Sequence, residues 1–129
     1  MTSLEPSRDR AWKRLPVFVA STFRDMDHER DVIHRIVVPQ VNQWLRSNRR
    51  GAEVYAVDLR WGLETDDRMD PDTRQRAILA TCAAEIARCR PLFLGLIGNA
   101  YGWVPPASAV RSALAKERLP RFSFPLSAT

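Results

Sequence analysis

Cysteine and histidine are scarce in this 129-residue chain, which has two of each. Cys82 and Cys89 lie seven residues apart in a stretch that reads as helix. At 1.5 Å per residue their Cα atoms are about 10.5 Å apart, beyond the roughly 7 Å limit for a disulfide. With only His28 and His34 besides, the sequence offers no zinc ligand set. We therefore expect free thiols on one face of a core helix, no metal, and a reducing, cytoplasmic setting.

A long hydrophobic segment is also missing. No run approaches the ~18 apolar residues of a membrane-spanning helix, and the first residues lack the apolar stretch of a signal peptide. We therefore expect no membrane association. Residues 1–14 are polar and charged and are interpreted as a flexible leader, followed by one α/β domain over 15–129.

Positive charge is in excess, but it is unevenly distributed along the chain. The formal net charge is +5, of which residues 1–15 carry +2 and residues 105–129 carry +3, so that 16–104 is neutral. A nucleic-acid-binding face on the core requires a local surplus of Lys and Arg. This count indicates none, and no nucleic-acid partner is expected.

The chain does contain an alternation of short apolar runs and amphipathic stretches. Residues 15–20, 53–59 and 91–97 are rich in β-forming residues and predict buried strands. Between and after them, three stretches have helical apolar spacing, the last over about 107–118. This order favours an α/β fold with an open parallel sheet, flanking helices and right-handed crossovers.

Local signals mark the helices between these strands. Thr22 and Asp25 have the spacing of a capping box ahead of the first helix, and Asp70 followed by Pro71 is a favoured start for the second. Pro39 lies inside the first helix, where it removes a backbone hydrogen bond at a cost of about 3 kcal/mol if the helix stays straight. We expect a kink or a two-part helix near residue 38.

The segments that follow the three strands are rich in polar, glycine and aromatic residues. The carboxyl ends of parallel strands share one edge of the sheet, and ligands bind beyond that edge. The sequence therefore predicts a ligand-binding rim there. Its members are Ser21, Thr22, Phe23, Arg24 and Asp25 after the first strand, Asp58, Arg60 and Trp61 after the second, and Gly98, Tyr101 and Trp103 after the third.

Two kinds of role are open for these side chains. The hydroxyls and arginines of the rim suit a phosphate or carboxylate, and its aromatic rings suit stacking on a nucleobase or nicotinamide. Alternatively, Arg60 pairs with Asp58 or Asp25, Ser21 caps the first helix, and the rings pack under the loops. A Walker-type phosphate loop is absent from the sequence. Both histidines are expected in structural or surface roles on a helix, so a Ser-His-Asp triad is not expected.

Three separated motifs resemble a known family. They read VFVASTFRDM at 17–26 followed by ERD at 29–31, VDLRWG at 57–62, and CAAEIARCRPLFLGLIGNAYGW at 82–103. Together they resemble TIR-like domains, long labelled as of unknown function, that precede NACHT-type NTPase domains and WD or tetratricopeptide repeats. Telomerase-associated and nephrocystin-like proteins contain such domains. The resemblance covers about residues 15–106.

The resemblance implies a TIR/flavodoxin-like sheet in a signalling or effector module of a STAND-type NTPase, of the kind found in innate immunity or antiphage defence. Some TIR domains hydrolyse the N-glycosidic bond of NAD, whereas others only assemble. NAD is therefore expected as a substrate, not as a bound cofactor. The implied partners are further copies of the domain and the downstream NTPase and repeat domains of the same chain.

The resemblance places the catalytic glutamate of NAD-cleaving members after the Gly-Trp-Val-Pro-Pro loop and an insertion. It is therefore expected beyond Thr129, in a domain that is incomplete at its C-terminal end. Glu85, on the helix before the third strand, is the candidate inside the chain. A non-catalytic interaction module and a nucleoside-transferase-like enzyme are the alternative functions.

Overall fold

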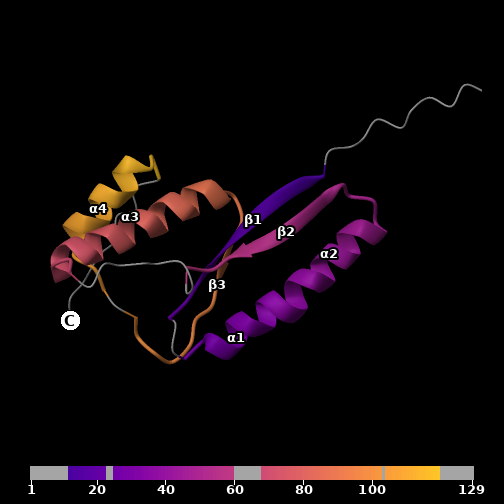
Figure 1. The fold of residues 1–129 in the computed structure, drawn as a ribbon, viewed down its shortest axis with the longest axis horizontal. Helices are drawn as coiled ribbons and strands as arrows, with labels where there is room; N and C mark the ends of the chain where they lie inside the picture. The colour runs from indigo at the N-terminus through magenta and orange to yellow at the C-terminus, as the bar shows by residue number, and fades with distance from the viewer. Residues whose placement is uncertain (1–11, 23–24, 60–67, 103, 120–129) are drawn as a thin grey trace, which may run out of the picture.

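The computed structural model of the chain describes residues 12–22, 25–59, 68–102 and 104–119 (Figure 1). Within these ranges one parallel sheet has the strand order β2-β1-β3. The strands are β1 (Lys13–Ala20), β2 (Ala52–Val57) and β3 (Phe93–Gly95). In register, Lys13 lies opposite Ala52, and Phe18 lies opposite both Val57 and Phe93. The expected open parallel α/β fold is confirmed.

The helices cover both faces of this sheet. They are α1 (Asp27–Val32), the π-helical turn η1 (Ile33–Val37), α2 (Val38–Ser47), α3 (Pro71–Cys89) and α4 (Ala107–Lys116). Figure 1 shows α1 and α2 on one side of the sheet and α3 and α4 on the other. The chain runs outward from β1 to β2 and then returns past β1 to β3, so right-handed crossovers place the two sets of helices on opposite faces. The direction of winding reverses at β1.

The predicted interruption near residue 38 is confirmed. The N–H of Val38 donates to the carbonyl of Ile33, five residues earlier, which widens the helix by one residue over η1. Pro39, which has no N–H to donate, is the second residue of α2 and follows directly after this turn. Further along α2, the Asn42 side chain donates to the carbonyl of Val54 at 2.9 Å and accepts from its N–H at 2.7 Å. Asn42 thereby satisfies backbone groups of β2.

The two predicted helix starts have different outcomes. The capping box ahead of α1 is wrong, because Met26 is the N-cap residue and no side chain caps this helix. The Thr22 hydroxyl instead donates to the Asp25 carboxylate, which occupies both groups. The start of α3 is confirmed, since the Asp70 carboxylate accepts the Thr73 N–H at 3.0 Å. Hydrogen bonds from Thr73 hold the pKa of Asp70 below its usual value.

The described core is centred on β1. Phe18 and Val19 are 5% and 2% exposed, and the helical segments on both faces of the sheet contribute further buried residues, among them Ile33 and Cys89. The expectation of a third strand buried on both faces over 91–97 is wrong. This strand is short and lies at the edge of the described sheet, paired only with β1, and Phe93 is 56% exposed.

The expectation of free thiols is confirmed for Cys82 and Cys89, both on α3. Cys89 is 1% exposed, and burial raises the pKa of both thiols. We therefore predict that Cys89 resists an aromatic disulfide reagent at mildly alkaline pH in the native protein and reacts quickly in strong denaturant. Following thiolate release in a Cys82→Ser variant isolates Cys89. Immediate reaction of this variant without denaturant would contradict the packing of α3 on β1.

Candidate functional site

The loops that follow β1 and β3 pack directly against each other. A Cβ atom at Gly98 would lie 2.0 Å from the Cε of Met26 and 3.0 Å from Oδ2 of Asp25. A Cβ at Gly102 would lie 3.2 Å from Cγ2 of Thr22. The two glycines therefore allow a close approach that side chains would prevent. This contact lies where the winding of the sheet reverses, which is the usual ligand position in open α/β sheets.

Part of the predicted rim is thus brought together. Thr22, Asp25 and Gly98 lie in the contact between the two loops, and the Tyr101 ring in the third-strand loop is 92% exposed. The predicted members outside the described residues are Phe23, Arg24, Arg60, Trp61 and Trp103.

Asp58, predicted for the same rim, lies at the end of β2 with a fully buried side chain. Its Oδ1 forms an ion pair with Nη1 of Arg30, which is itself 1% exposed. Its Oδ2 lies 3.2 Å from Nε2 of His34. Asp58 therefore acts from inside the protein, as the counter-charge of a buried guanidinium.

Arg30 also holds the end of β1. Its Nε donates to the Ser21 hydroxyl at 2.7 Å and its Nη2 to the Ser21 carbonyl at 3.1 Å. Its Nη1 also reaches the carbonyl of Val19 at 3.4 Å. The Ser21 hydroxyl in turn donates to the Thr22 carbonyl at 2.6 Å, so it does not cap α1 as one prediction had it. One guanidinium from α1 thus joins the carboxyl ends of β1 and β2.

The sequence analysis assigned no role to Arg30 and expected only a structural or surface role for His34. The signal was present in the helical spacing. Arg30 and His34 are four residues apart, and Arg30 precedes the buried Ile33 by three, so the two polar residues lie on or beside the inner face of their helix. A charge on that face needs a buried counter-charge, and Asp58 follows directly after an apolar strand.

Glu85 lies away from the rim. Its Oε2 forms an ion pair with Nη2 of Arg88 at 2.7 Å, and Nη1 of Arg88 donates to the Tyr55 hydroxyl at 3.0 Å. The hydrogen bond that Arg88 donates to Glu85, more than the one it donates to Tyr55, raises the pKa of Arg88. Tyr55 is in the middle of β2, so this group is held beside the sheet and not at its carboxyl edge.

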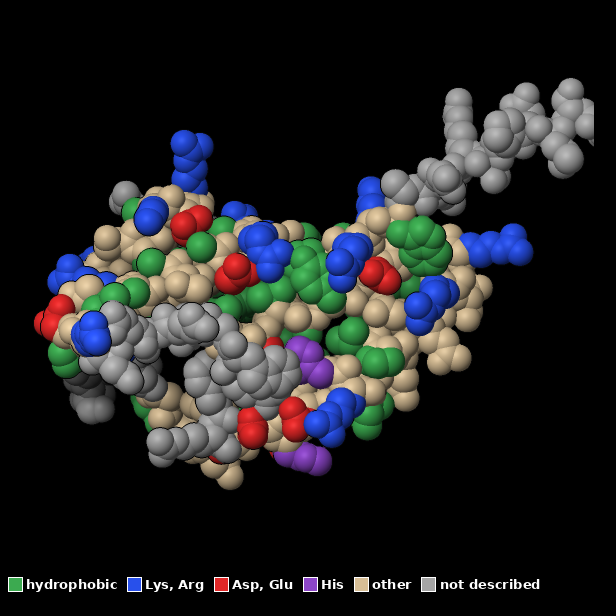
Figure 2. Space-filling view, in the orientation of Figure 1, with side chains coloured by type: hydrophobic (Ala, Val, Ile, Leu, Met, Phe, Trp, Pro, Cys, Tyr) green, Lys and Arg blue, Asp and Glu red, His purple; other side chains and the backbone are tan. Residues whose placement is uncertain are grey.

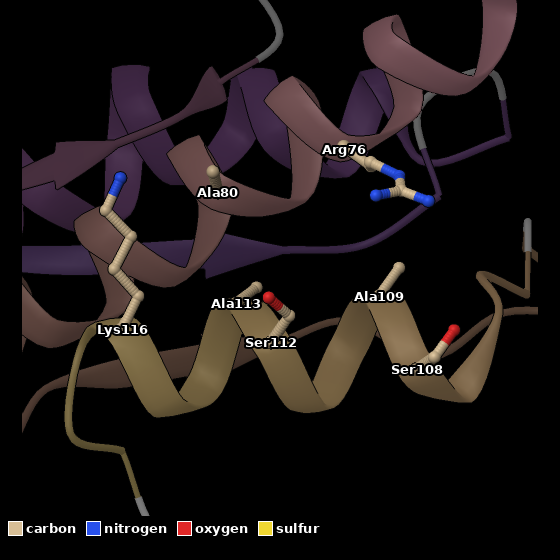
Figure 3. A pocket seen from close by; sticks show the side chains of 7 residues that line it. All are labelled: Arg76, Ala80, Ser108, Ala109, Ser112, Ala113 and Lys116. Atoms are coloured by element: carbon tan, nitrogen blue, oxygen red, sulfur yellow. The ribbon is translucent and has the colours of Figure 1, made fainter.

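A groove of about 320 Å³ lies between α3 and α4, on the face opposite α1 and α2 (Figure 3). Small side chains line most of it, and Arg76 and Lys116 stand on either side. Its lining residues are Arg76, Ala80, Ser108, Ala109, Ser112, Ala113 and Lys116. No group of three or more His, Cys, Asp or Glu residues in the described ranges has a metal-binding arrangement. Nor does any described helix have the length and apolar character to span a membrane.

The chain is similar to segments of several large proteins. It is 35% identical over 104 residues to telomerase protein component 1 of Mus musculus, covering 81% of this chain and 4% of that protein. It is 31% identical over 105 residues to NACHT and WD repeat domain-containing protein 2 of Homo sapiens, covering 79% and 6%. A TPR repeat-containing protein of Dictyostelium discoideum is 31% identical over 91 residues, covering 70% and 5%.

The chain therefore spans only a small part of the length of these relatives, and no solved structure matches it. The model of one family, described as a domain of unknown function (DUF4062), matches residues 16–118, and the chain belongs to this family.

Proposed function

We propose that the domain is a TIR-like effector module of a multidomain NACHT-type protein, and that it binds NAD or a related nucleotide at the rim. The observation that carries the proposal is the packing of the third-strand loop on the first-strand loop, Gly98 against Met26 and Asp25, where the sheet reverses its winding. The similarity to proteins named for NACHT and WD repeat domains supports the multidomain setting.

The proposed reaction is hydrolysis of the N-glycosidic bond. Nicotinamide leaves C1′ of the ribose with the bonding electron pair, water adds its oxygen to C1′, and a proton is released to solvent. The exposed Tyr101 ring offers a surface for a flat base, while Arg24 and Arg60 would neutralise phosphates. Asp58 is paired with Arg30 and Glu85 with Arg88, so neither carboxylate is assigned to the ribose. The family resemblance implies another carboxylate for that role.

Nicotinamide release from NAD by the complete protein, in its assembled and unassembled states, tests the proposal. We expect release from the assembled state and its loss in Arg60→Ala. Gly98→Ala should lower turnover by about 10-fold, because the new Cβ displaces the Met26 and Asp25 side chains of the first-strand loop. Gly95→Ala is the matched control, since a Cβ there makes an ordinary 3.4 Å contact with Phe93. No release from either state would overturn the catalytic proposal.

A second candidate function, a non-catalytic self-association module, is favoured by a separate observation. Residues 91–110 contain no charged side chain, and within them Phe93, Ile97 and Val104 are 56%, 97% and 55% exposed. An uncharged apolar surface of this kind suits contact with an identical copy, because a two-fold interface places like residues against like. Ile97→Lys should then prevent assembly of the complete protein in sedimentation, without changing its helix content. Unchanged assembly would contradict this candidate.

A further inference from the structure

The fold brings two basic segments together at the edge of the sheet opposite the rim. The N–H of Lys13, the first residue of β1, donates to the carbonyl of Gly51 at 3.0 Å. Lys13 therefore lies beside Gly51, which directly follows Arg49 and Arg50 in the connection between α2 and β2. The count of charge along the sequence missed this, because it grouped Lys13 and Arg14 with the leader and averaged the arginines after α2 with distant acids. We call this cluster the basic end; its cations are Lys13, Arg14, Arg46, Arg49 and Arg50.

Two tryptophans lie within the basic end. Trp12 and Trp44 are 54% and 56% exposed, and the Arg50 guanidinium carbon lies 5.8 Å from the centroid of the Trp44 ring. Figure 2 shows Lys and Arg side chains gathered around a large hydrophobic side chain where the chain enters β1. Exposed indole rings flanked by guanidinium groups provide apolar faces and positive charge on the same surface.

The backbone holds two of these arginines in a fixed turn. Arg49 has a φ of 52°, in the left-handed region, and its N–H donates to the carbonyl of Arg46 at 3.0 Å. Arg50 donates to the carbonyl of Leu45 at 3.0 Å. Glycine or asparagine adopts this conformation at a helix end with less strain than arginine does. This turn fixes the point at which the Arg49 side chain leaves the backbone.

Most of the positive charge is free to meet a ligand. Arg14 is engaged by Glu53, with Nε 2.9 Å from Oε1, and lies over the ring of Tyr55. The other four cations form no ion pair with any part of the chain that the structure describes. Cations near the C-terminus of α2 also complement the helix dipole, but that does not account for Lys13 or for the exposed rings.

We propose that the basic end binds single-stranded nucleic acid, with Lys13, Arg46, Arg49 and Arg50 on the phosphates and bases stacked on Trp12 and Trp44. An acidic peptide would match the charge, but its carboxylates do not alternate regularly with flat rings. An anionic membrane would require the Trp44 ring to insert into lipid, whereas the Arg50 guanidinium carbon lies 5.8 Å from the centroid of that ring. Phosphates alternating with planar bases match both features of the surface.

The proposal predicts a strong dependence on salt. Four cations on phosphates give a slope of about −2.8 in log affinity against log salt for a single strand. Affinity should therefore fall about fifty-fold between ~50 and ~200 mM salt. Anisotropy of labelled oligouridylate and oligodeoxythymidylate of about 20 nucleotides, with the 129-residue chain, measures this and separates RNA from DNA. Absence of binding to both oligomers at low salt would overturn the proposal.

Two matched double variants test the location of the site. Arg46→Gln with Arg50→Gln should lower affinity at least about tenfold and make the salt slope shallower by about 1.4. Arg111→Gln with Lys116→Gln removes the same charge from α4 and should change affinity less than about twofold. If both double variants lost the same affinity, the oligonucleotide would be attracted by the net charge of the protein alone. That result would overturn the assignment of the site to the basic end.

Two further measurements separate nucleic acid from other polyanions. Trp44→Ala should weaken oligonucleotide binding and leave binding of inorganic polyphosphate unchanged, because polyphosphate has no rings to stack. Arg49→Gly should raise the denaturation midpoint while it lowers oligonucleotide affinity, a combination that a purely structural arginine would not give. Tighter binding to phosphatidylserine vesicles than to either oligomer, or equal loss of polyphosphate binding in Trp44→Ala, would overturn the proposal.

Discussion

Arg30→Met is expected to lower the free energy of unfolding by about 3–5 kcal/mol, a large part of the total stability of a domain of this size. Methionine approximates the length of the arginine stem but leaves the fully buried Asp58 carboxylate without its counter-charge. It also removes the donors to the Ser21 hydroxyl and carbonyl. The cost is the desolvation of groups that stay buried without partners.

Urea unfolding followed by circular dichroism measures this effect, and two variants act as controls. Arg14→Met breaks the ion pair with Glu53, in which the Arg14 side chain is 69% exposed, and should cost less than about 1 kcal/mol. Arg30→Met combined with Asp58→Leu removes both buried charges and should recover part of the lost stability. If the double variant were less stable than Arg30→Met alone, the buried pair would not be the source of the effect.

Phe18→Ala is expected to cost about 3–5 kcal/mol, because it leaves a cavity beside the central strand of the described sheet. Phe18 is 5% exposed, and its ring stacks on that of Phe93 with centroids 5.8 Å apart. Phe93→Ala breaks the same ring pair from the other side and should cost only about 1 kcal/mol, because Phe93 is already 56% exposed.

Denaturant unfolding of the two phenylalanine variants measures the difference between their losses in unfolding free energy. An unchanged m-value confirms that both variants still unfold in two states. The difference is expected because burial, rather than ring stacking, dominates the contribution of each ring. Equal losses of unfolding free energy at the two positions would show that the ring stacking, and not burial, provides the stabilisation. That result would contradict the exposed position of Phe93 at the edge of the described sheet.

Strand and helix types were predictable because they depend on local pattern. The runs at 15–20 and 53–59 are rich in β-forming residues and lie in β1 and β2, although β2 is only half-buried. Pro39 indicated a break in its helix. The third strand was overestimated because an apolar run has the same sequence whether both its faces are covered or one is open. The exposure of Phe93 depends on its position at the edge of the described sheet, which no local pattern encodes.

The candidate site was predictable in its place but not in its internal contacts. The rule for parallel strand ends located Thr22, Asp25 and Gly98 correctly as neighbours, because it follows from topology alone. Arg30 was overlooked because arginine is rarely buried, and the sequence analysis assigned it no role. The partner of Asp58 was sought among the loops, whereas α1 supplies it.

The π-helical turn has a consequence for rotational phase. Arg30 and Asn42 are twelve residues apart, which at about 100° per residue would set their side chains about 120° apart around a regular α-helix. The extra residue taken up by η1 reduces that difference to about 20°. Arg30 can then hold the end of β1 while Asn42 satisfies Val54 on β2. One added residue puts both anchors of a single helical segment in phase with the sheet.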